Sequence, residues 1–223
     1  NRNYNSPKTH RGLAFENALL DAVMLLEERP DDAYLVGSVD EISSYNFNID
    51  RLAGCFRKEI VSNRDLFNNS LPGTIAGEGS LMMIVSNQSA EAVAKLAAFQ
   101  TIHTTDEMLV WETAEKFLQQ HGFPGSGVDL LITGENGDAR LEKYYQRIES
   151  LFSGNTSIAR FKHLSGEYCT ASSFGFWLAT EILRTSQIPE IVLKKRGNSP
   201  VKRILLYNNF QGLQHAFILL TKP

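Results

Sequence analysis

Hydrophobic residues recur at helical spacing near the start of the chain. Between residues 13 and 28 (LAFENALLDAVMLLEE), the apolar positions that fall on one helical face are Leu13, Leu19, Leu20, Val23, Met24 and Leu26. Pro30 and the two aspartates after it end this predicted helix. The next segment, AYLVGSV (33–39), is short and apolar at successive positions. That pattern predicts a buried strand in a parallel or mixed sheet covered by helices.

Further strands and helices follow along the middle of the chain. SLMMIVSN (80–87) predicts a second strand, and AVAKLAAFQTIHT (92–104) predicts one that continues after a hairpin. Residues 106–120 return to helical spacing, and we expect four of them to face inward: Met108, Leu109, Ala114 and Phe117. VDLLIT (128–133) predicts another buried strand, and residues 135–152 predict a turn that leads into a helix.

The last third of the chain completes an α/β pattern. TASSFGFWLATEILRT (170–185) predicts a helix whose first turn is rich in small residues. VKRILLYNNF and HAFILLTK are apolar runs separated by QGLQ, which predicts a terminal hairpin. Strands that alternate with helices in this way indicate the α/β class.

Composition excludes several kinds of partner and site. The 22 basic and 25 acidic residues give a net charge of −3, and KKRGNSPVKR is the single basic cluster, so we expect no nucleic-acid partner. No apolar run approaches the roughly 20 residues that cross a bilayer, and the polar start does not resemble a signal peptide. Two cysteines without a CxxC motif do not indicate a metal site. We therefore expect a cytoplasmic protein without metal or cofactor.

Five segments in a fixed order carry a resemblance to a known family. They are AYLVGSVDE (33–41), IAGEGSLMMIVSN (75–87), VDLLITGENGD (128–138), KHLSGEY (162–168) and YNNFQGLQHAFILL (207–220). Each is weakly specific by itself. Together and in this order they resemble the later part of a β-ketoacyl synthase, a thiolase-like enzyme that condenses acyl chains in fatty acid and polyketide assembly.

The resemblance implies a fold. Family members have a layered αβαβα architecture that stacks two similar halves. Residues 1–90 resemble the end of the first half and residues 91–223 the second half, so we expect one domain that lacks its N-terminal part. On this basis, about 130 residues or more of the fold would precede Asn1.

The resemblance also implies an active site that can be checked position by position. Ketosynthases use a cysteine nucleophile at a helix N-terminus, two histidines that stabilise developing charge, and a lysine that orients one histidine. The nucleophile window, residues 4–12, contains no cysteine, and Ser6 or Thr9 would stand there instead. Gly134 and Glu135 follow the strand that delivers the first histidine. Lys162 matches the family lysine, and Glu167 occupies the position of the second histidine.

These replacements change the chemistry of the implied site. An ionised carboxylate at position 167 cannot donate a hydrogen bond to an oxyanion, and it would repel a malonyl carboxylate. We expect Glu167 to form an ion pair with Lys162 instead.

Other residues carry two interpretations each. His163 is either a displaced catalytic histidine or a structural residue, since neighbours on a backbone point in different directions. Asn208, Phe210 and His215 lie in the segment that resembles a substrate-pocket loop, or they stabilise a turn. Cys169, in the first turn of a predicted helix, is either a reactive thiol or a buried packing residue, and Cys55 is a packing residue on another predicted helix. Glu135 and Asp138 flank Asn136 and Gly137, which favour a tight turn over acid–base chemistry.

Three functions from different classes remain open. The first is a ketosynthase-like subunit without condensing activity, which resembles the chain-length-factor partners of active ketosynthases. The second is an active β-ketoacyl synthase whose cysteine precedes Asn1 and whose oxyanion site uses Asn136, His163 or His215. The third is an unrelated α/β binding protein.

The resemblance implies partners as well. We expect an acyl carrier protein and a homodimer or a heterodimer with a ketosynthase, paired near the strand at residues 33–39. It further implies a bacterial origin and a role in fatty acid or polyketide biosynthesis, with no cofactor.

Overall fold

The computed structural model describes residues 5–68, 70–88, 90–123, 127–152 and 154–223. The helices are α1 (Ala14–Glu28), α2 (Ser44–Leu52), α3 (Glu107–Gln120), α4 (Glu142–Glu149), α5 (Lys162–Ser165) and α6 (Ser172–Thr185), with short 3-10 helices η1 (Asn63–Asp65) and η3 (Glu190–Val192). The strands are β1 (Ala33–Asp40), β2 (Gly79–Ser86), β3 (Lys95–His103), β4 (Leu130–Thr133), β5 (Ser157–Arg160), β6 (Leu193–Lys195), β7 (Arg203–Phe210) and β8 (Gln214–Thr221).

The described strands form two sheets. β1 and β2 pair antiparallel as a two-stranded sheet, and the other six pair in the order β3-β8-β7-β4-β5-β6. β4 runs parallel to both β5 and β7, whereas β7 and β8 form the predicted terminal hairpin. The six-stranded sheet is therefore mixed, with its parallel strands at the centre.

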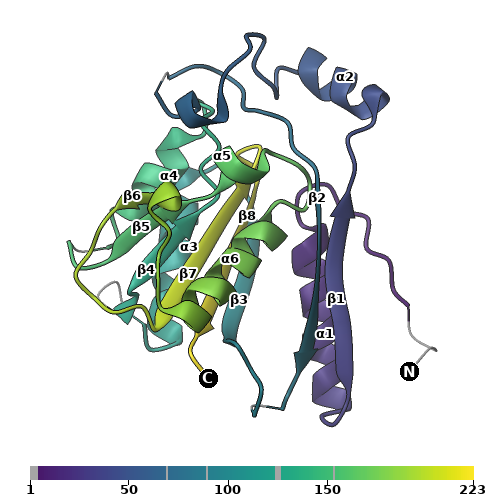
Figure 1. Cartoon of the computed structure of the whole chain (residues 1–223), viewed down its shortest axis with the longest axis vertical. Coiled ribbons are helices and arrows are strands. Elements are labelled where there is room, and N and C mark those ends of the chain that lie inside the picture. Colours follow the sequence, from purple (N-terminus) through teal and green to yellow (C-terminus); the bar gives the residue numbers. More distant parts are fainter. Residues whose placement is uncertain (1–4, 69, 89, 124–126, 153) are drawn as a thin grey trace.

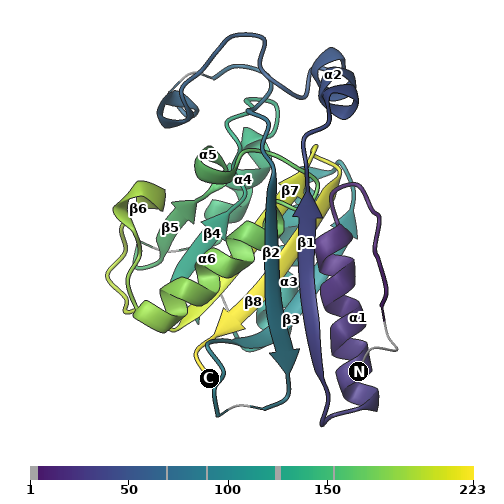
Figure 2. The same ribbon diagram turned by 45° about the vertical axis from the view of Figure 1, so that its right-hand side comes forward.

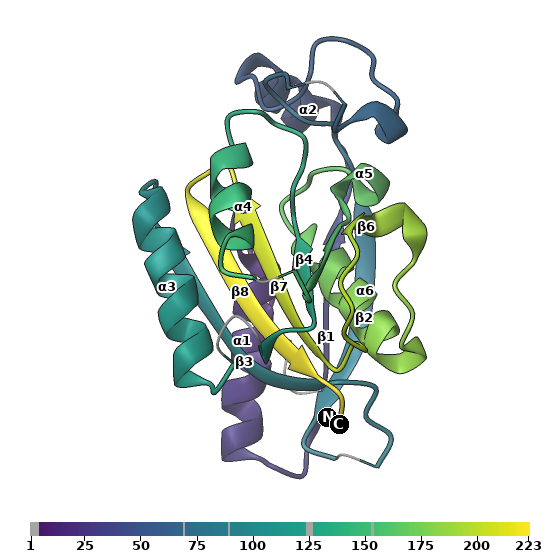
Figure 3. The same ribbon diagram turned by 90° about the vertical axis from the view of Figure 1, so that its left-hand side faces the viewer.

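Helices separate and cover these sheets in layers. α3 and α4 lie on one face of the six-stranded sheet, and α6 and α1 lie on the other face, between that sheet and the β1–β2 sheet (Figures 1 and 3). Phe15 of α1 and Phe176 of α6 meet edge to face with their ring centroids 5.6 Å apart. The chain thus has four successive layers, α, β, α and β.

Two hydrophobic cores hold the layers together because both faces of the central sheet are apolar. Alternate residues of β4 illustrate this: Leu130 and Ile132 belong to the core under α1 and α6, and Leu131 belongs to the core under α3 and α4. The predicted helices at residues 13–28 and 170–185 and the strand at 128–133 are confirmed.

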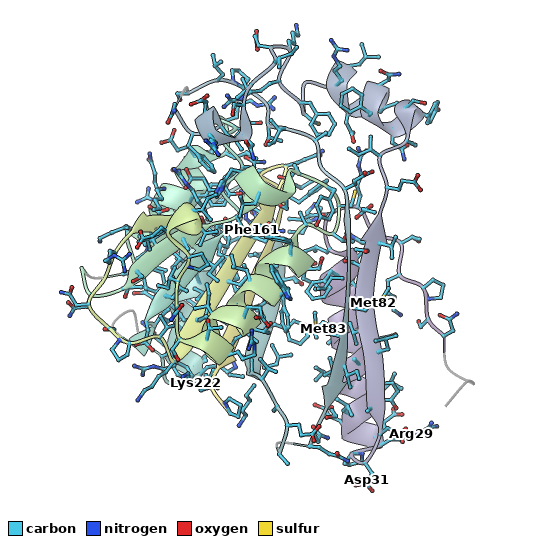
Figure 4. The ribbon with its side chains drawn as sticks, viewed as in Figure 1. Arg29, Asp31, Met82, Met83, Phe161 and Lys222 are labelled. Atoms are coloured by element: carbon cyan, nitrogen blue, oxygen red, sulfur yellow. The ribbon has the colours of Figure 1, made fainter. Side chains whose placement is uncertain are left out.

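The β1–β2 sheet corrects one prediction. Residues 33–39 were expected to be buried on both faces, but Leu35 and Val39 are 71% and 68% exposed. On β2, Ile84, which pairs with Leu35, and Met82, which pairs with Gly37, are also exposed. Figure 4 shows Met82 and Met83 on opposite sides of β2, with Met83 toward α6. The sheet has a covered inner face and an open, apolar outer face.

Three further predictions need correction. Residues 92–104 form a strand, but β3 pairs with β8 and not with β2. On α3, Ala114 and Phe117 are buried as expected, whereas Met108 and Leu109 are 42% exposed, because Val110 and Leu118 complete the inward face. Cys55 follows α2 in a turn and does not lie on a helix. The helix expected at Cys55 lies earlier in the chain, since α2 covers Ser44–Leu52; it projects beyond the body in Figure 2. Short β5 and β6 were not predicted.

None of the helices in the described ranges is long and apolar enough to span a bilayer.

Candidate functional site

The candidate site lies at one edge of the six-stranded sheet, where parallel strands end together. β4 ends at Thr133, β5 at Arg160 and β7 at Phe210, and these strands run in the same direction. The segments that follow them therefore meet, although they are far apart in the sequence. This topology brings the GENGD turn, α5 and the β7–β8 turn into one cluster.

Lys162 and Glu167 form the centre of the cluster. Lys162 Nζ donates to both carboxylate oxygens of Glu167 at 2.8 Å, which confirms the expected ion pair. Asn136 Nδ2 donates to Glu167 Oε2 at 2.6 Å. Lys162 is fully buried and Glu167 is 9% exposed. The carboxylate is thus held by three donor contacts, and the ammonium group has its counterion at contact distance.

The backbone around Glu167 is held by the glycine-rich turn. Glu167 pairs with Ala76 as an isolated β-bridge, and Gly77 N donates to Glu167 O at 3.1 Å. Gly166 has a φ of +71°, and a Cβ on Gly77 would lie 2.0 Å from Ser165 O. Glycine is needed here because the two backbones touch. Gly77 and Gly166 therefore allow the close approach of the two backbones.

Gly134 leaves no room for a side chain. A Cβ at this position would lie 2.3 Å from Asn208 Oδ1 and 3.1 Å from Lys162 Cε. Asn208 is 4% exposed, and its Oδ1 has no hydrogen-bond partner among the residues that the structure describes. The space beside the end of β4, where the resemblance places a histidine, is filled by an asparagine and a lysine.

A pocket of about 310 Å³ opens over this cluster. Glu167 and Asn136 line it together with Phe210, Cys55 and Cys169. Phe210, which the sequence resemblance assigns to a substrate pocket, is among the lining residues. The pocket therefore contains both cysteines of the chain above a paired carboxylate.

The two thiols are not activated by their surroundings. Burial raises the pKa of Cys169, and nearby Asp40 raises it further, while Arg11 and the backbone of Gly12 have smaller opposing effects. Burial also raises the pKa of Cys55. Cys169 stands in the turn before α6, three residues ahead of its first residue, so the predicted place in a helical first turn is corrected.

The start of α1 is the place where the resemblance expects the nucleophile. Its N-cap is Leu13, preceded by Gly12, and no cysteine occurs at residues 5–13; residue 4 lies outside the described ranges. Ser6 and Thr9 precede the helix in a segment without regular secondary structure.

Glu16, in the first turn of α1, is a buried acid that the sequence analysis missed. Burial raises the pKa of its carboxyl to about 7, against smaller opposing effects of Ser172, its own backbone and Lys162. Neither Glu16 oxygen makes a hydrogen bond of standard geometry within the described part of the chain. The sequence around Glu16, between Phe15 and Asn17 on an amphipathic helix, does not indicate that this side chain is buried. Its burial depends on where α6 packs against α1.

Two predicted histidines lie away from the pocket. His163 follows Lys162 but faces the opposite way, with Nε2 2.8 Å from Ile191 O. His215 is fully buried in the core under α3 and α4, between Tyr207 OH and Thr104 O, each at 3.0 Å. Burial lowers the pKa of His215 to about 4, so this histidine is neutral near pH 7. On β8 its position points away from the site because successive residues of a strand face opposite sides.

Glu135 and Asp138 each have a cationic partner outside the central ion pair. Glu135 pairs with Arg160 at 3.1 Å and Lys194 at 2.6 Å, and Asp138 pairs with Arg140 at 2.5 Å. Gly137 has a φ of +77°, which is the tight turn that the sequence favoured.

Within the described ranges, no three His, Cys, Asp or Glu side chains are grouped so that they could hold a metal ion.

Comparison with solved structures identifies the fold. One match is a type II PKS acyl-carrier protein in complex with its ketosynthase bound to the hexaketide, at a TM-score of 0.77 and 16% identity, covering 95% of this chain and 61% of that chain. A β-ketoacyl synthase from Burkholderia phymatum STM815 matches at 0.71 and 13%, covering 97% and 61%. The ishigamide ketosynthase/chain length factor matches at 0.73 and 15%, covering 98% and 60%.

The chain therefore has the thiolase-like fold of ketosynthases, and it spans less than two thirds of the length of these structures. No family model matches the sequence. Comparison with curated protein sequences gives no match either.

Proposed function

We propose that this chain is a ketosynthase-like subunit of fatty acid or polyketide biosynthesis that does not condense acyl chains itself. It pairs with a condensing ketosynthase and works with that enzyme's acyl carrier protein. One observation carries the proposal: Glu167, at the position where the sequence resemblance expects a catalytic histidine, is held by Lys162 and Asn136.

The electrostatics of the pocket support a non-condensing role. Condensation needs hydrogen-bond donors aimed at the oxygen where negative charge develops. Here the amide of Asn136, which lines the pocket, and the buried ammonium group of Lys162 are already committed to Glu167. A substrate oxyanion would face a carboxylate instead of an imidazole, and a malonyl carboxylate would be repelled.

The geometry at the two other expected positions supports the same role. Gly134 is packed against Asn208 and Lys162, so no group can occupy the place of the other histidine without moving them. α1 begins at Ala14, after the N-cap Leu13, and no thiol stands at its start. The nearest cysteine, Cys169, has its pKa raised by burial, which lowers the fraction of reactive thiolate at neutral pH.

The outer face of the β1–β2 sheet, formed by Leu35, Val39, Met82 and Ile84, supports pairing with another polypeptide. A solvated sheet face ordinarily carries polar residues. This face instead carries four large apolar side chains, and contiguous apolar surface of this kind marks a protein interface. Among the matched structures are a ketosynthase bound by its carrier protein and a ketosynthase/chain length factor, which is the kind of assembly proposed for this chain.

Co-expression tests the proposal. The full-length protein is expressed alone and with candidate condensing ketosynthases encoded beside it, and condensation of malonyl and acyl groups on a carrier protein is measured for each. We expect no condensation by the chain alone, a stable complex with one ketosynthase, and a product whose length changes when the chain is omitted. Condensation by the chain alone would instead indicate an active synthase that supplies its nucleophile from residues ahead of Asn1.

A further inference from the structure

A second pocket of about 480 Å³ lies on the other side of α5 from the candidate site. It shares no lining residue with the pocket over Glu167. Its polar lining comes from Asn63 and Arg64 of η1, Arg160 at the end of β5, and His163 of α5. Phe67 and three aliphatic side chains form the rest. The pocket is therefore cationic at some positions and apolar at others.

The two arginines differ in how they are held. Arg160 pairs with Glu135 at 3.1 Å, and its guanidinium carbon lies 3.4 Å from the centroid of the Phe67 ring. This stacking fixes the planar group against the pocket wall. Arg64 is exposed and has no ion pair with any residue that the structure describes. Glu135 also pairs with Lys194, which in turn pairs with Glu149 at 2.8 Å, so these two acids balance Arg160 and Lys194. The net positive charge at the pocket therefore comes from Arg64.

His163 supplies a third polar group with unused capacity. The residue is 8% exposed and its Nε2 lies 2.8 Å from Ile191 O, which fixes the ring as a donor on that side. Its Nδ1 is buried and has no hydrogen-bond partner in the described part of the chain. A buried nitrogen of this kind ordinarily finds a partner. The Phe67 ring lies edge-on to the imidazole, with the two ring centroids 5.4 Å apart.

We propose that this second pocket binds a small organic anion, a carboxylate or phosphate ester attached to an apolar body. Arg64 and Arg160 contact the anionic oxygens, and His163 Nδ1 completes the polar end. Phe67, Leu164 and Leu193 contact the apolar body. The proposal does not depend on the function proposed for the Glu167 pocket, because the two pockets have separate linings.

Binding should change the protonation of His163. Burial lowers the pKa of this imidazole, and the charge of Arg160 lowers it further. The charged side chains on the lining are Arg64 and Arg160, both positive, and the remaining residues are neutral. A bound anion would favour the imidazolium and raise the pKa of His163, and Nδ1 would then donate to the anion.

Titration followed by NMR tests the site. The imidazole signals of the five histidines are recorded while phenyl phosphate, benzoate or neutral benzyl alcohol is added to the full-length protein, and His163→Gln assigns the relevant signal. We expect saturable shifts of His163 with either anion and none with benzyl alcohol. The tighter of the two anions identifies the ligand as a phosphate ester or a carboxylate.

Variants make the result decisive. Arg64→Gln should weaken anion binding roughly tenfold, because it removes one charge-assisted contact. Arg184→Gln is the matched control, since Arg184 is an exposed arginine of α6 that pairs with Glu181, and it should leave binding unchanged. The proposal is overturned if neither anion shifts His163, if benzyl alcohol binds as well as the anions, or if the two arginine variants behave alike.

Discussion

Lys162 and Glu167 are buried together, with the ammonium nitrogen 2.8 Å from each carboxylate oxygen. A buried pair of this kind compensates two desolvated charges and contributes little net stability compared with an apolar pair. Each residue therefore contributes to stability mainly by neutralising the buried charge of the other. Removal of one partner should destabilise the fold more than removal of both.

Glu167→Gln should lower the free energy of unfolding by about 3–5 kcal/mol, because the Lys162 charge is left buried without a counterion. The double variant Lys162→Met with Glu167→Gln should recover a large part of that loss. Urea unfolding followed by circular dichroism measures both. Glu181→Gln, in an exposed pair with Arg184, serves as control and should change the free energy of unfolding far less. A Glu167→Gln loss as small as that of the control would contradict the account.

Gly134→Ala should destabilise the protein by about 1–3 kcal/mol, because the new methyl group overlaps Asn208 Oδ1. In an Asn208→Ala background the cost of Gly134→Ala should largely disappear. Thermal and urea unfolding of the four proteins measures this coupling. Gly154→Ala is the matched control, since a Cβ there meets nothing within 4 Å. Equal costs for Gly134→Ala in both backgrounds would show that the space is not filled as described.

Glu16 should make stability depend on pH. Its pKa is raised in the folded protein from 4.5 to about 7, so the unfolded chain releases this proton at lower pH than the folded one. The contribution is fully present below pH 4.5 and is lost as pH rises toward 7 and above, by about 3 kcal/mol. Glu16→Gln should remove this loss, whereas Glu27→Gln on the exposed side of α1 should retain it. Unfolding free energies between pH 4 and 9 decide between the two outcomes.

The two thiols should react slowly. Because burial raises the pKa of both Cys55 and Cys169, alkylation by iodoacetamide at pH 7 should be slower than that of a free cysteine and should accelerate above pH 9. Peptide mapping separates the two sites, and Cys55→Ser and Cys169→Ser provide the assignment. A thiol that is fully alkylated within minutes at pH 7 would indicate an activated nucleophile. That result would favour the alternative function, an active β-ketoacyl synthase.

The outer face of the β1–β2 sheet should govern association. Leu35→Glu with Ile84→Glu places two charges on exposed cross-strand neighbours, so the fold should be retained while pairing with a ketosynthase is lost. Co-purification and light scattering measure pairing, and circular dichroism verifies the fold. Met24→Glu, on the exposed side of α1, is the control and should pair normally. Undiminished pairing of the double variant would place the interface elsewhere.

Much of the fold could be predicted from the sequence because its main elements have strong periodicity. α1, α6 and the β7–β8 hairpin carry clear apolar patterns and were found with nearly correct bounds. β5 and β6 were missed because strands of 4 and 3 residues are too short to give a pattern. The outward face of β1 was misjudged because an exposed apolar residue looks the same in sequence as one in a core.

In the candidate site, the contact that could be predicted is the one between residues close together in a single motif. Lys162 and Glu167 are five residues apart, and their ion pair follows from one short turn. Asn136 contacts Glu167 because β4 and β5 pair in parallel and end side by side. The sequence does not reveal which strands are neighbours, so this contact was not predicted. His163 and His215 were harder to place, because one residue of shift on α5 or β8 decides which face a side chain occupies.

The absence of self-acylation is the central claim, and intact-mass spectrometry tests it most directly. The full-length protein is incubated with an acyl-carrier-protein thioester, beside an active ketosynthase as positive control. The account predicts that the mass of the protein stays unchanged while the ketosynthase gains one acyl group. A stable acyl adduct on this chain, mapped to one residue and lost when that residue is replaced, would contradict it.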